Sequence, residues 1–357
     1  MGNSARVGAQ IAVDEINQVG GYLGRHLELV IRDDKADPDT GLKAAEDLVL
    51  KEKVIATIGF CNTGVAMKAL DVFQKNKQIL FVTCATGTGI TAKYPAEQSF
   101  IFRTSAPDVL QTQFLVDDIV KRGLKRVALL VDSSGYGEAG LTDLNAALKK
   151  AGFPPPTTIR FKVGVTTLTE ELKELRQSGA DAVIGWTVGP EQGVISAARA
   201  AIGWKVPYFA PWGLSHASAY LGSPEGVEGG YMVQTVLPNI YLDRNRAFLS
   251  SYLKISKERP IGSMMSAAQT YDAMHLLLRG MFESKGDLSG PSLKSALEQI
   301  PRPYYGVVTT YDKPFSTKDH DIISANMLWL GTWRKGEREY AYKEDERRAT
   351  VIRRKQE

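Results

Sequence analysis

The chain has 357 residues, which exceeds the size that one hydrophobic core usually supports, so two domains are expected. Its composition, 43% hydrophobic and 24% charged, is ordinary for a globular protein, and no run of about 18 apolar residues predicts a membrane-spanning helix. The formal net charge of +4 is small, and Lys and Arg are mixed with Asp and Glu, which argues against a nucleic-acid-binding surface.

The early part of the chain alternates helical and strand patterns with short breaks, which is typical of an α/β fold with parallel sheets. Residues 6–19 carry apolar side chains at helical spacing, and the glycine pair at 20–21 predicts the end of that helix. Residues 27–34 are expected to form a strand that ends in acidic side chains, and a new helix is expected after the Asp-Pro at 37–38. Two buried strands and the helix between them are expected at 54–60, through about residue 75, and at 79–83.

A second block with the same alternation begins after a connecting segment at 103–106. The expected helices are 108–121, a helix to Lys150, 167–178 and 190–202, and the expected strands are 126–132, 157–163, 181–186 and 206–211. A strand at 229–238 and three helical stretches follow, at about 243–258, 263–284 and 291–300. Residues 304–312 and 326–333 look like antiparallel additions, and the last 24 residues, dense in both charges, are expected to form a solvated, partly frayed tail.

The sequence lacks the motifs that most enzymes of this fold class carry. Its four histidines, at positions 26, 216, 275 and 320, have no metal-ligand spacing and no adjacent carboxylate partner. No G-x-S-x-G elbow and no Walker-type GK[ST] occurs, and the Gly-Thr-Gly at 87–89 is only half of a dinucleotide fingerprint. We therefore predict a protein without catalytic residues, metal or cofactor.

Small polar residues follow two of the expected strands, where ligands bind in open α/β sheets. One loop contains Asn62 and Thr63 directly before a helix, and the other runs from Thr83 through Ala85 and Thr86. Their hydroxyls and free backbone N–H groups would suit a carboxylate. The alternative is that the threonines only cap helices or turns, which is their commonest use.

Aromatic residues end three strands of the second block: Tyr136, Trp186 and Trp212. One such residue would usually be packing. Three of them in different strand-end loops favour a cleft wall, since ligand sites combine apolar walls with few polar groups.

In the order and spacing of many segments, the chain resembles the branched-chain amino-acid (Leu/Ile/Val-type) periplasmic binding proteins, the type I solute-binding proteins of ABC importers. The segments that carry this resemblance extend along nearly the whole sequence: 8–38, 56–66, 79–91, 100–108, 129–140 and 203–213. The resemblance implies two doubly wound parallel-sheet lobes joined by a hinge of three crossing segments, near 103–106, 234–238 and 312–326. The implied lobes are 1–104 with 237–318, which grips the carboxylate, and 105–236 with 319–357, which carries the aromatic wall.

By the same resemblance, Thr63, Ala85 and Thr86 form the carboxylate site and Tyr136 faces them from the second lobe. An alignment shifted within this loop would place Thr83 or Gly87 in the site instead. The implied partners are a small carboxylate ligand and the permease and ATPase of an ABC importer. The protein would act outside the cytoplasm, in the periplasm, as a monomer.

The sequence departs from the family pattern in three ways. The family's opening strand has no counterpart, because the sequence starts at the first helix, so we expect a compromised sheet edge or an upstream part that is not shown. Trp212 stands where amino-acid binders place an acid for the ligand ammonium, which favours a carboxylate with an aromatic or apolar tail, although Glu191 would supply the charge in a shifted register. Cys61 lacks the family's usual disulfide partner, since that position is Ala36, and we favour free thiols over a bond to Cys84.

Two rival functions remain open on the sequence. The chain begins without a secretory signal, which would suit a ligand-sensing regulator of the same fold in the cytoplasm. A branched-chain amino-acid binder proper is the other alternative, and a doubly wound enzyme is disfavoured by the missing motifs.

Overall fold

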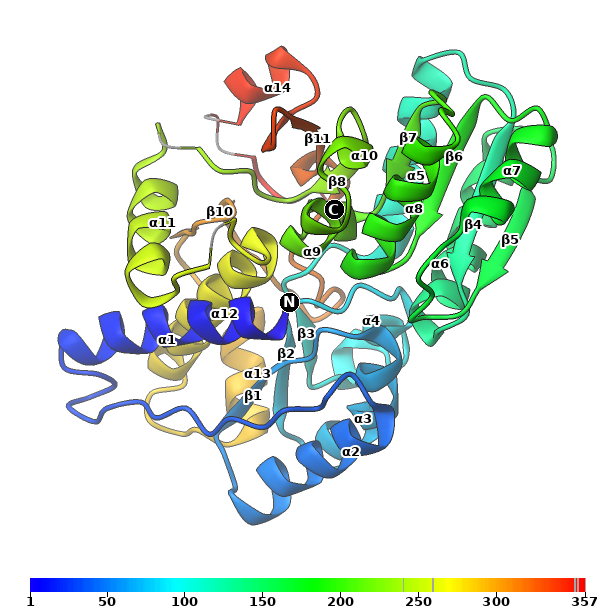
Figure 1. Cartoon of the computed structure of the whole chain (residues 1–357). Coiled ribbons are helices and arrows are strands. Elements are labelled where there is room, and N and C mark those ends of the chain that lie inside the picture. Colours follow the sequence, from blue (N-terminus) through cyan, green and yellow to red (C-terminus); the bar gives the residue numbers. More distant parts are fainter. Residues whose placement is uncertain (240, 259, 350, 352, 357) are drawn as a thin grey trace.

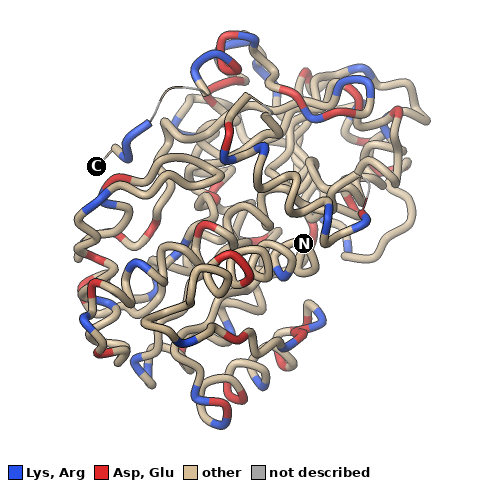
Figure 2. The backbone as a smooth tube through the Cα atoms, turned by 90° about the vertical axis from the view of Figure 1, so that its left-hand side faces the viewer, with Lys and Arg blue, Asp and Glu red and all other residues tan. Residues whose placement is uncertain are grey.

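The computed structural model describes residues 1–239, 241–258, 260–349, 351 and 353–356. They form two α/β lobes side by side, each with its own sheet (Figure 1). Lys and Arg alternate with Asp and Glu over the molecule, as the composition suggested (Figure 2). No helix in this part of the chain is long and apolar enough to cross a membrane.

The sheet of the first lobe is parallel and has three strands in the order β1-β2-β3. Buried side chains from its strands and from α3 pack on one another, among them Phe73, Leu80 and Ile101. The elements of this lobe up to β3 are α1 (Gly2–Gln18), α2 (Pro38–Glu46), the π-helical turn η1 (Asp47–Lys51), β1 (Ala56–Gly59), α3 (Thr63–Lys75), β2 (Ile79–Val82), α4 (Gly89–Ala92), the 3-10 turn η2 (Ala96–Gln98) and β3 (Ile101–Arg103).

The expected strand at 27–34 does not form, so this prediction was wrong. The segment makes no ladder with any described strand, and β1 pairs only with β2. A stretch of apolar residues is not sufficient for a strand, because the extended backbone must also find a neighbour for its N–H and C=O groups. The far edge of β1 is therefore open among the described residues, which agrees with the expected compromised edge.

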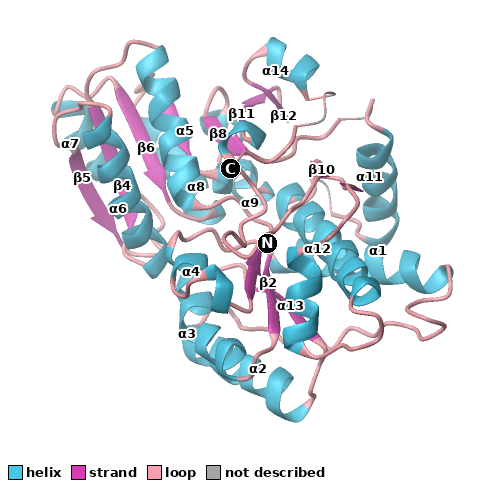
Figure 3. Cartoon of the chain, turned by 180° about the vertical axis from the view of Figure 1, so that it is seen from behind, coloured by secondary structure: helices cyan, strands magenta, loops and turns pink. Residues whose placement is uncertain are grey.

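The second lobe contains a seven-stranded sheet in the order β12-β11-β8-β7-β6-β4-β5. Helices cover both of its faces (Figure 3), since Leu129 of β4 packs with α5 and α6, while Leu130 packs with α7 and α8. Its elements are α5 (Asp108–Lys121), β4 (Val127–Asp132), α6 (Gly135–Lys150), β5 (Thr157–Phe161), α7 (Thr169–Gln177), β6 (Ala182–Trp186), α8 (Gly189–Ala201), β7 (Tyr208–Ala210), the 3-10 turn η3 (Trp212–Ser215), α9 (Ala217–Gly222), α10 (Pro224–Val227) and β8 (Tyr231–Gln234).

The C-terminal third first returns to the first lobe and then adds antiparallel strands, as expected. β9 pairs with β10, and β11 joins the large sheet antiparallel to β8. The elements are α11 (Asp243–Ile255), α12 (Met264–Glu283), α13 (Gly290–Glu298), β9 (Tyr304–Tyr305), β10 (Thr310–Tyr311), the 3-10 turn η4 (Ala325–Met327), β11 (Trp329–Arg334), β12 (Glu337–Tyr340) and α14 (Lys343–Arg348).

The expected frayed tail is partly wrong, because β12 and α14 lie within the last 24 residues. β12 forms a regular antiparallel ladder with β11, so the backbone finds partners that its charged side chains did not predict. Three residues of this stretch, 350, 352 and 357, lie outside the described residues.

In the described residues the chain passes between the lobes three times: between β3 and α5, between β8 and α11, and between β10 and β11. The first and third of these connections lie against each other, since Arg103 donates its backbone N–H to the carbonyl of His320 and Ile322 donates to the carbonyl of Arg103. These connections fall near the expected hinge segments. The lobe boundaries themselves remain a prediction.

Helix α1 is held on the first lobe by close packing against α12. A Cβ atom added at Gly8 would lie 2.1 Å from the carbonyl oxygen of Ala267, a backbone atom that cannot move aside by rotating a side chain. The two helix backbones can therefore approach this closely only with glycine at this position.

We expect Gly8→Ala to destabilise the protein by about 2 kcal/mol, although alanine normally favours a helix. The matched control is Gly2→Ala in the same helix, where an added Cβ meets nothing within 4 Å. Chemical denaturation of both variants checks this. Equal stabilities would contradict the close helix contact.

Candidate functional site

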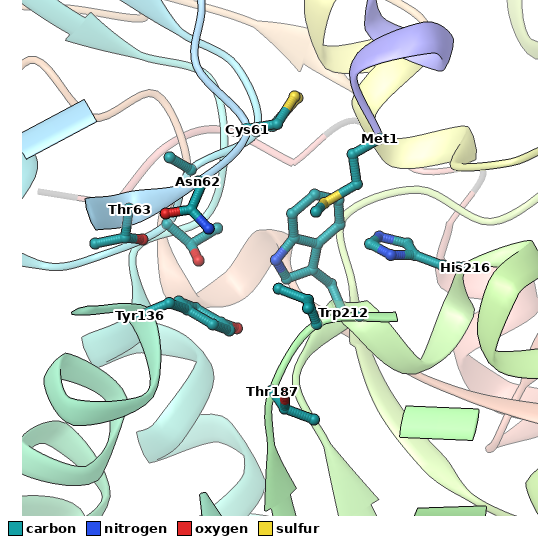
Figure 4. Close-up of a pocket in the computed structure, with 13 residues that line it drawn as sticks. Met1, Cys61, Asn62, Thr63, Tyr136, Thr187, Trp212 and His216 are labelled. Carbon is teal, nitrogen blue, oxygen red and sulfur yellow. The ribbon is translucent and has the colours of Figure 1, made fainter. Parts of the chain in front are cut away.

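A small cavity lies between the lobes, where the loops after β1 and β2 face loops of the second lobe (Figure 4). Its solvent-accessible volume is about 10 Å³, about the space of one water molecule by that measure. The residues that line it are Met1, Cys61, Asn62, Thr63, Cys84, Ala85, Thr86, Tyr136, Thr187, Val188, Trp212, Gly213 and His216.

The lobes touch at the rim of this cavity. The hydroxyl of Thr88 in the first lobe donates to Asp143 Oδ2 on α6 at 2.6 Å. A Cβ at Gly135 would lie 3.3 Å from the Cα of Gly64, so two glycines let the backbones meet. The cavity is therefore small because the lobes are closed on each other.

The first-lobe side of the cavity is built by the start of α3. Asn62 is the N-cap of this helix, and its side-chain oxygen accepts from the N–H groups of Gly64 and Val65, at 2.9 and 3.3 Å. Thr63, the next residue, accepts the N–H of Gly87 on its hydroxyl oxygen at 3.1 Å. Asn62 therefore caps the helix and Thr63 holds the neighbouring loop, and both also line the cavity.

The loop after β2 supplies fewer backbone donors than the sequence suggested. The N–H of Ala85 is used, since it donates to the carbonyl of Phe60 at 2.9 Å, and its carbonyl accepts from Ser105. The N–H of Thr86, a residue that lines the cavity, donates to no described group. Ala85 thus contributes a wall, and Thr86 has a free backbone donor.

The second lobe contributes rings and small residues from several strand ends. Tyr136 stands at the start of α6, and Trp212 and His216 lie around η3, with their rings edge to face and centroids 4.8 Å apart. Figure 4 shows Thr63 and Asn62 across the cavity from Trp212, with Tyr136 below them. Of the predicted residues, the structure brings Asn62, Thr63, Ala85, Thr86, Tyr136 and Trp212 together.

Two predicted residues do not line the cavity. Thr83 turns toward α12, where its hydroxyl accepts from Thr270 at 2.8 Å. Trp186 lies behind Tyr136, with ring centroids 5.9 Å apart, and its indole fills the space beside Gly140. Trp186 is the last residue of β6 and Thr83 directly follows β2, and both side chains turn toward helices, so the residues just beyond Trp186 reach the cavity instead.

Sequence reasoning missed Thr187 and His216, whereas Val188 was expected at the wall together with Trp186 and does line the cavity. Thr187 directly follows Trp186, so the strand-end rule pointed to the right loop. His216 follows Trp212 by four residues, but an isolated histidine carries no signal in the sequence. It became a candidate only when η3 brought it to the cavity.

Two polar atoms of the cavity wall are buried without a partner among the described residues: the hydroxyl of Tyr136 and Nε2 of His216. Burial raises the pKa of Tyr136 well above its ordinary value, so the side chain remains a neutral phenol. Burial also lowers the pKa of His216 to about 3, so the imidazole is neutral near pH 7. A buried polar atom without a partner is costly, so both atoms suit a ligand that would bind them.

The side chains that line the cavity carry no formal charge at neutral pH. Among its described lining residues none is Asp, Glu, Lys or Arg. Glu191, the alternative counter-charge for an ammonium, is buried elsewhere and accepts from the N–H of Gly164 at 2.9 Å. No group of His, Cys, Asp and Glu in the described part of the chain has the arrangement of a metal site.

One carboxyl group is buried just behind the cavity wall. Asp108 at the start of α5 is fully buried, and burial raises its pKa to about 7. Its Oδ1 accepts from Gln111 at 3.2 Å, whereas Oδ2 has no described partner. Because the pKa is higher in the folded than in the unfolded chain, this group stabilises the fold at low pH, and that stability is lost as the pH rises through about 7.

We expect Asp108→Asn to melt higher than the parent at pH 8 by a few degrees, and to lose less stability between pH 5 and pH 8. The control is Asp117→Asn, an exposed position in the same helix. Melting temperatures over this pH range check the expectation. An identical pH profile for parent and Asp108→Asn would contradict it.

The two cysteines lie side by side at the first-lobe edge of the cavity. Both are free thiols, as favoured from the sequence, with their Sγ atoms 2.6 Å apart. They occupy equivalent places two residues beyond the paired ends of β1 and β2. Their proximity follows from the register of the parallel strands.

Comparisons with known proteins agree with this architecture. A family model described as "Periplasmic binding protein" matches residues 1–338. The Leu/Ile/Val-binding protein homolog 3 of Brucella melitensis is 30% identical over 197 residues, which is 55% of this chain and 52% of that protein. The chain thus spans about half the length of this curated relative.

Two solved structures share the fold at low sequence identity. A branched-chain amino acid transporter substrate binding protein from Streptococcus pneumoniae, in complex with isoleucine, has a TM-score of 0.80 at 23% identity and covers 95% of this chain and 93% of its own. An ABC transporter solute binding protein from R. palustris, in complex with benzoate, has a TM-score of 0.80 at 20% identity, covering 95% and 91%. One fold therefore accommodates both kinds of ligand.

Proposed function

Since the chain belongs to the periplasmic binding protein family, we propose that it is the extracytoplasmic solute-binding component of an ABC importer, and that its lobes close on a small carboxylate with an aromatic or apolar tail. The observation that carries the proposal is the character of the cavity: neutral donors on one side, rings on the other, and no acid among the lining residues.

The carboxylate end of the ligand would lie against the first lobe. The hydroxyl of Thr63 and the N–H of Thr86 are donors there, and the unpartnered hydroxyl of Tyr136 approaches from the second lobe. Neutral donors suffice, because a hydrogen bond to a charged acceptor is roughly twice as strong as one between neutral groups. Exclusion of water on closure strengthens these bonds further.

The tail of the ligand would pack on Trp212 and Val188. These side chains offer a ring face and a small apolar surface, the usual composition of a pocket wall. An α-amino group in the same place would bury an ammonium without a counter-charge, which costs several kcal/mol. The lining thus favours acids that lack the amino group over amino acids.

The cavity has room for about one water here, so the lobes must stand farther apart to hold the ligand, and they must open further for the ligand to exchange. The three crossing segments would provide the hinge, and the Thr88–Asp143 bond across the rim would break on opening. The closed form would then be recognised by the membrane permease, whose partner ATPase supplies the energy. The protein itself needs no nucleotide, metal or catalytic group for this role.

The second candidate is a branched-chain amino-acid binder, which the name of the Brucella melitensis relative favours. A thermal-shift screen separates the two, with benzoate, 4-hydroxybenzoate and 4-methylpentanoate as acids, and leucine and valine as amino acids. Ligand at about 100 times its dissociation constant stabilises the native state by about 2.7 kcal/mol, which is readily visible. Shifts with the acids are expected. Shifts with leucine or valine alone would overturn the proposed ligand class.

A further inference from the structure

Arg103, the last residue of β3, lies behind the loop at 83–88 that follows β2, called the ligand loop below. Arg103 does not line the cavity between the lobes. Its side chain is 1% exposed, and all five guanidinium N–H groups have acceptors. Nε and Nη2 donate to the two carboxylate oxygens of Asp321, at 2.6 and 2.9 Å, and Nη2 also donates to Thr91 at 2.8 Å. Nη1 donates to two backbone carbonyls of the ligand loop.

These two carbonyls belong to Thr86 and Gly87, at 3.1 and 2.7 Å from Nη1. The peptide between Thr86 and Gly87 is therefore held at both ends. Its carbonyl accepts from Arg103 and from the N–H of Asp108, and its own N–H donates to the hydroxyl oxygen of Thr63 at 3.1 Å. A charged donor on the carbonyl polarises the peptide and strengthens the hydrogen bond of its N–H.

The hydrogen bond from the N–H of Gly87 determines whether the hydroxyl of Thr63 acts as a donor or an acceptor toward the cavity. Since its oxygen accepts that N–H, its proton must point elsewhere, and no described acceptor binds it. The side chain lines the cavity and is 4% exposed. Thr63 is thus presented as a donor to whatever lies in the cavity. Space at this point is tight as well, because a Cβ on Gly87 would lie 2.2 Å from Cγ2 of Thr63.

We propose that Arg103 is a positioning residue for ligand binding: through the peptide between Thr86 and Gly87, it holds the hydroxyl of Thr63 in the orientation that donates to the carboxylate. This inference rests on the proposed function for the identity of the acceptor. This role explains why one nitrogen of a fully buried arginine donates to two carbonyls of this loop. It also links the loop to the hinge, since Asp321 lies in the connection between β10 and β11.

A double-mutant cycle tests the relay, with benzoate as the probe and calorimetry as the measurement. We expect Thr63→Val to weaken benzoate binding about 10- to 100-fold, because it removes a hydrogen bond to a charged group. Arg103→Lys should weaken binding about 10-fold, since an ammonium keeps the charge but cannot serve both carbonyls and Asp321. In a protein that already carries Thr63→Val, adding Arg103→Lys should weaken benzoate binding by less than about 3-fold. Full additivity of the two effects would overturn the relay.

The matched control is Arg122→Lys. Arg122 is a partly buried arginine on the second lobe, paired with Asp118 at the end of α5 and away from the cavity, so benzoate affinity should not change. If Arg103→Lys does not fold, Asp321→Asn replaces it with the same expected pattern, because Asp321 anchors the same guanidinium from a side chain that is 22% exposed.

Hydrogen exchange of the Gly87 amide tests the relay without any ligand. In protein labelled with ¹⁵N-glycine, this amide should exchange at least about 10-fold faster in Thr63→Val and in Arg103→Lys than in the parent. An unchanged rate in Arg103→Lys would contradict the proposal. A parent protein that binds no acid of the panel would count against the proposed function alone, and this exchange rate would then decide the relay by itself.

Discussion

Tyr136→Phe is expected to weaken the binding of benzoate about 10-fold while leaving the unliganded protein as stable as the parent or more stable. The hydroxyl of Tyr136 is buried and has no partner among the described residues, so it costs free energy in the empty protein. Bound carboxylate would accept from it, and the variant would lose that bond. Calorimetry gives the affinity, and thermal denaturation without ligand gives the stability.

A loss of benzoate affinity without a loss of stability distinguishes a binding role of this hydroxyl from a packing role. A structural hydroxyl would lower stability when removed and would leave affinity nearly unchanged. Tyr94→Phe is a suitable control, because Tyr94 lies outside the cavity with its hydroxyl bonded to Asp71. For Tyr136→Phe, a fall in stability with unchanged benzoate affinity would remove this residue from the site.

Asp272→Ala is expected to destabilise the protein by about 3 to 5 kcal/mol. This carboxylate on α12 is fully buried and accepts four hydrogen bonds, from the N–H groups of Val307 and Val308, at 2.8 and 2.9 Å, and from the hydroxyls of Tyr304 and Tyr311, at 3.2 and 2.9 Å. These bonds hold the β9–β10 hairpin on α12 of the first lobe. Its loss leaves several buried donors unsatisfied at once, the most costly kind of deletion.

Urea denaturation measures this effect, and Asp243→Ala is the control. Asp243 is an exposed aspartate whose side chain is 89% accessible and forms an ion pair with Arg246 three residues on, so its removal should change stability by less than about 0.5 kcal/mol. A loss below about 1 kcal/mol for Asp272→Ala would mean that the hairpin is held by other contacts.

The helices and parallel strands were predictable from the sequence because local patterns determine them. The helix expected at 108–121 has those bounds, and the strand expected at 181–186 differs by one residue. The failures were non-local. Residues 27–34 have a strand pattern but no described neighbour, and β12 finds a neighbour that its charged residues did not suggest.

The candidate site was predictable to the level of loops and not of side chains. Asn62 and Thr63 lie where the loop after β1 enters α3, so the strand-end rule placed them correctly. The same rule chose Trp186, whose side chain turns back under α6 because it is still the last residue of its strand. His216 could not be found this way, since η3, rather than a strand end, carries it to the cavity.

The central claim is that the two lobes close on a carboxylate with no counter-charge for an ammonium group. Leucine and 4-methylpentanoate differ only by the α-amino group, so the ratio of their dissociation constants, measured by calorimetry on the same preparation, isolates that feature. The account predicts that 4-methylpentanoate binds at least about 10-fold more tightly than leucine. Tighter binding of leucine would show that the site provides for an ammonium and would contradict the account.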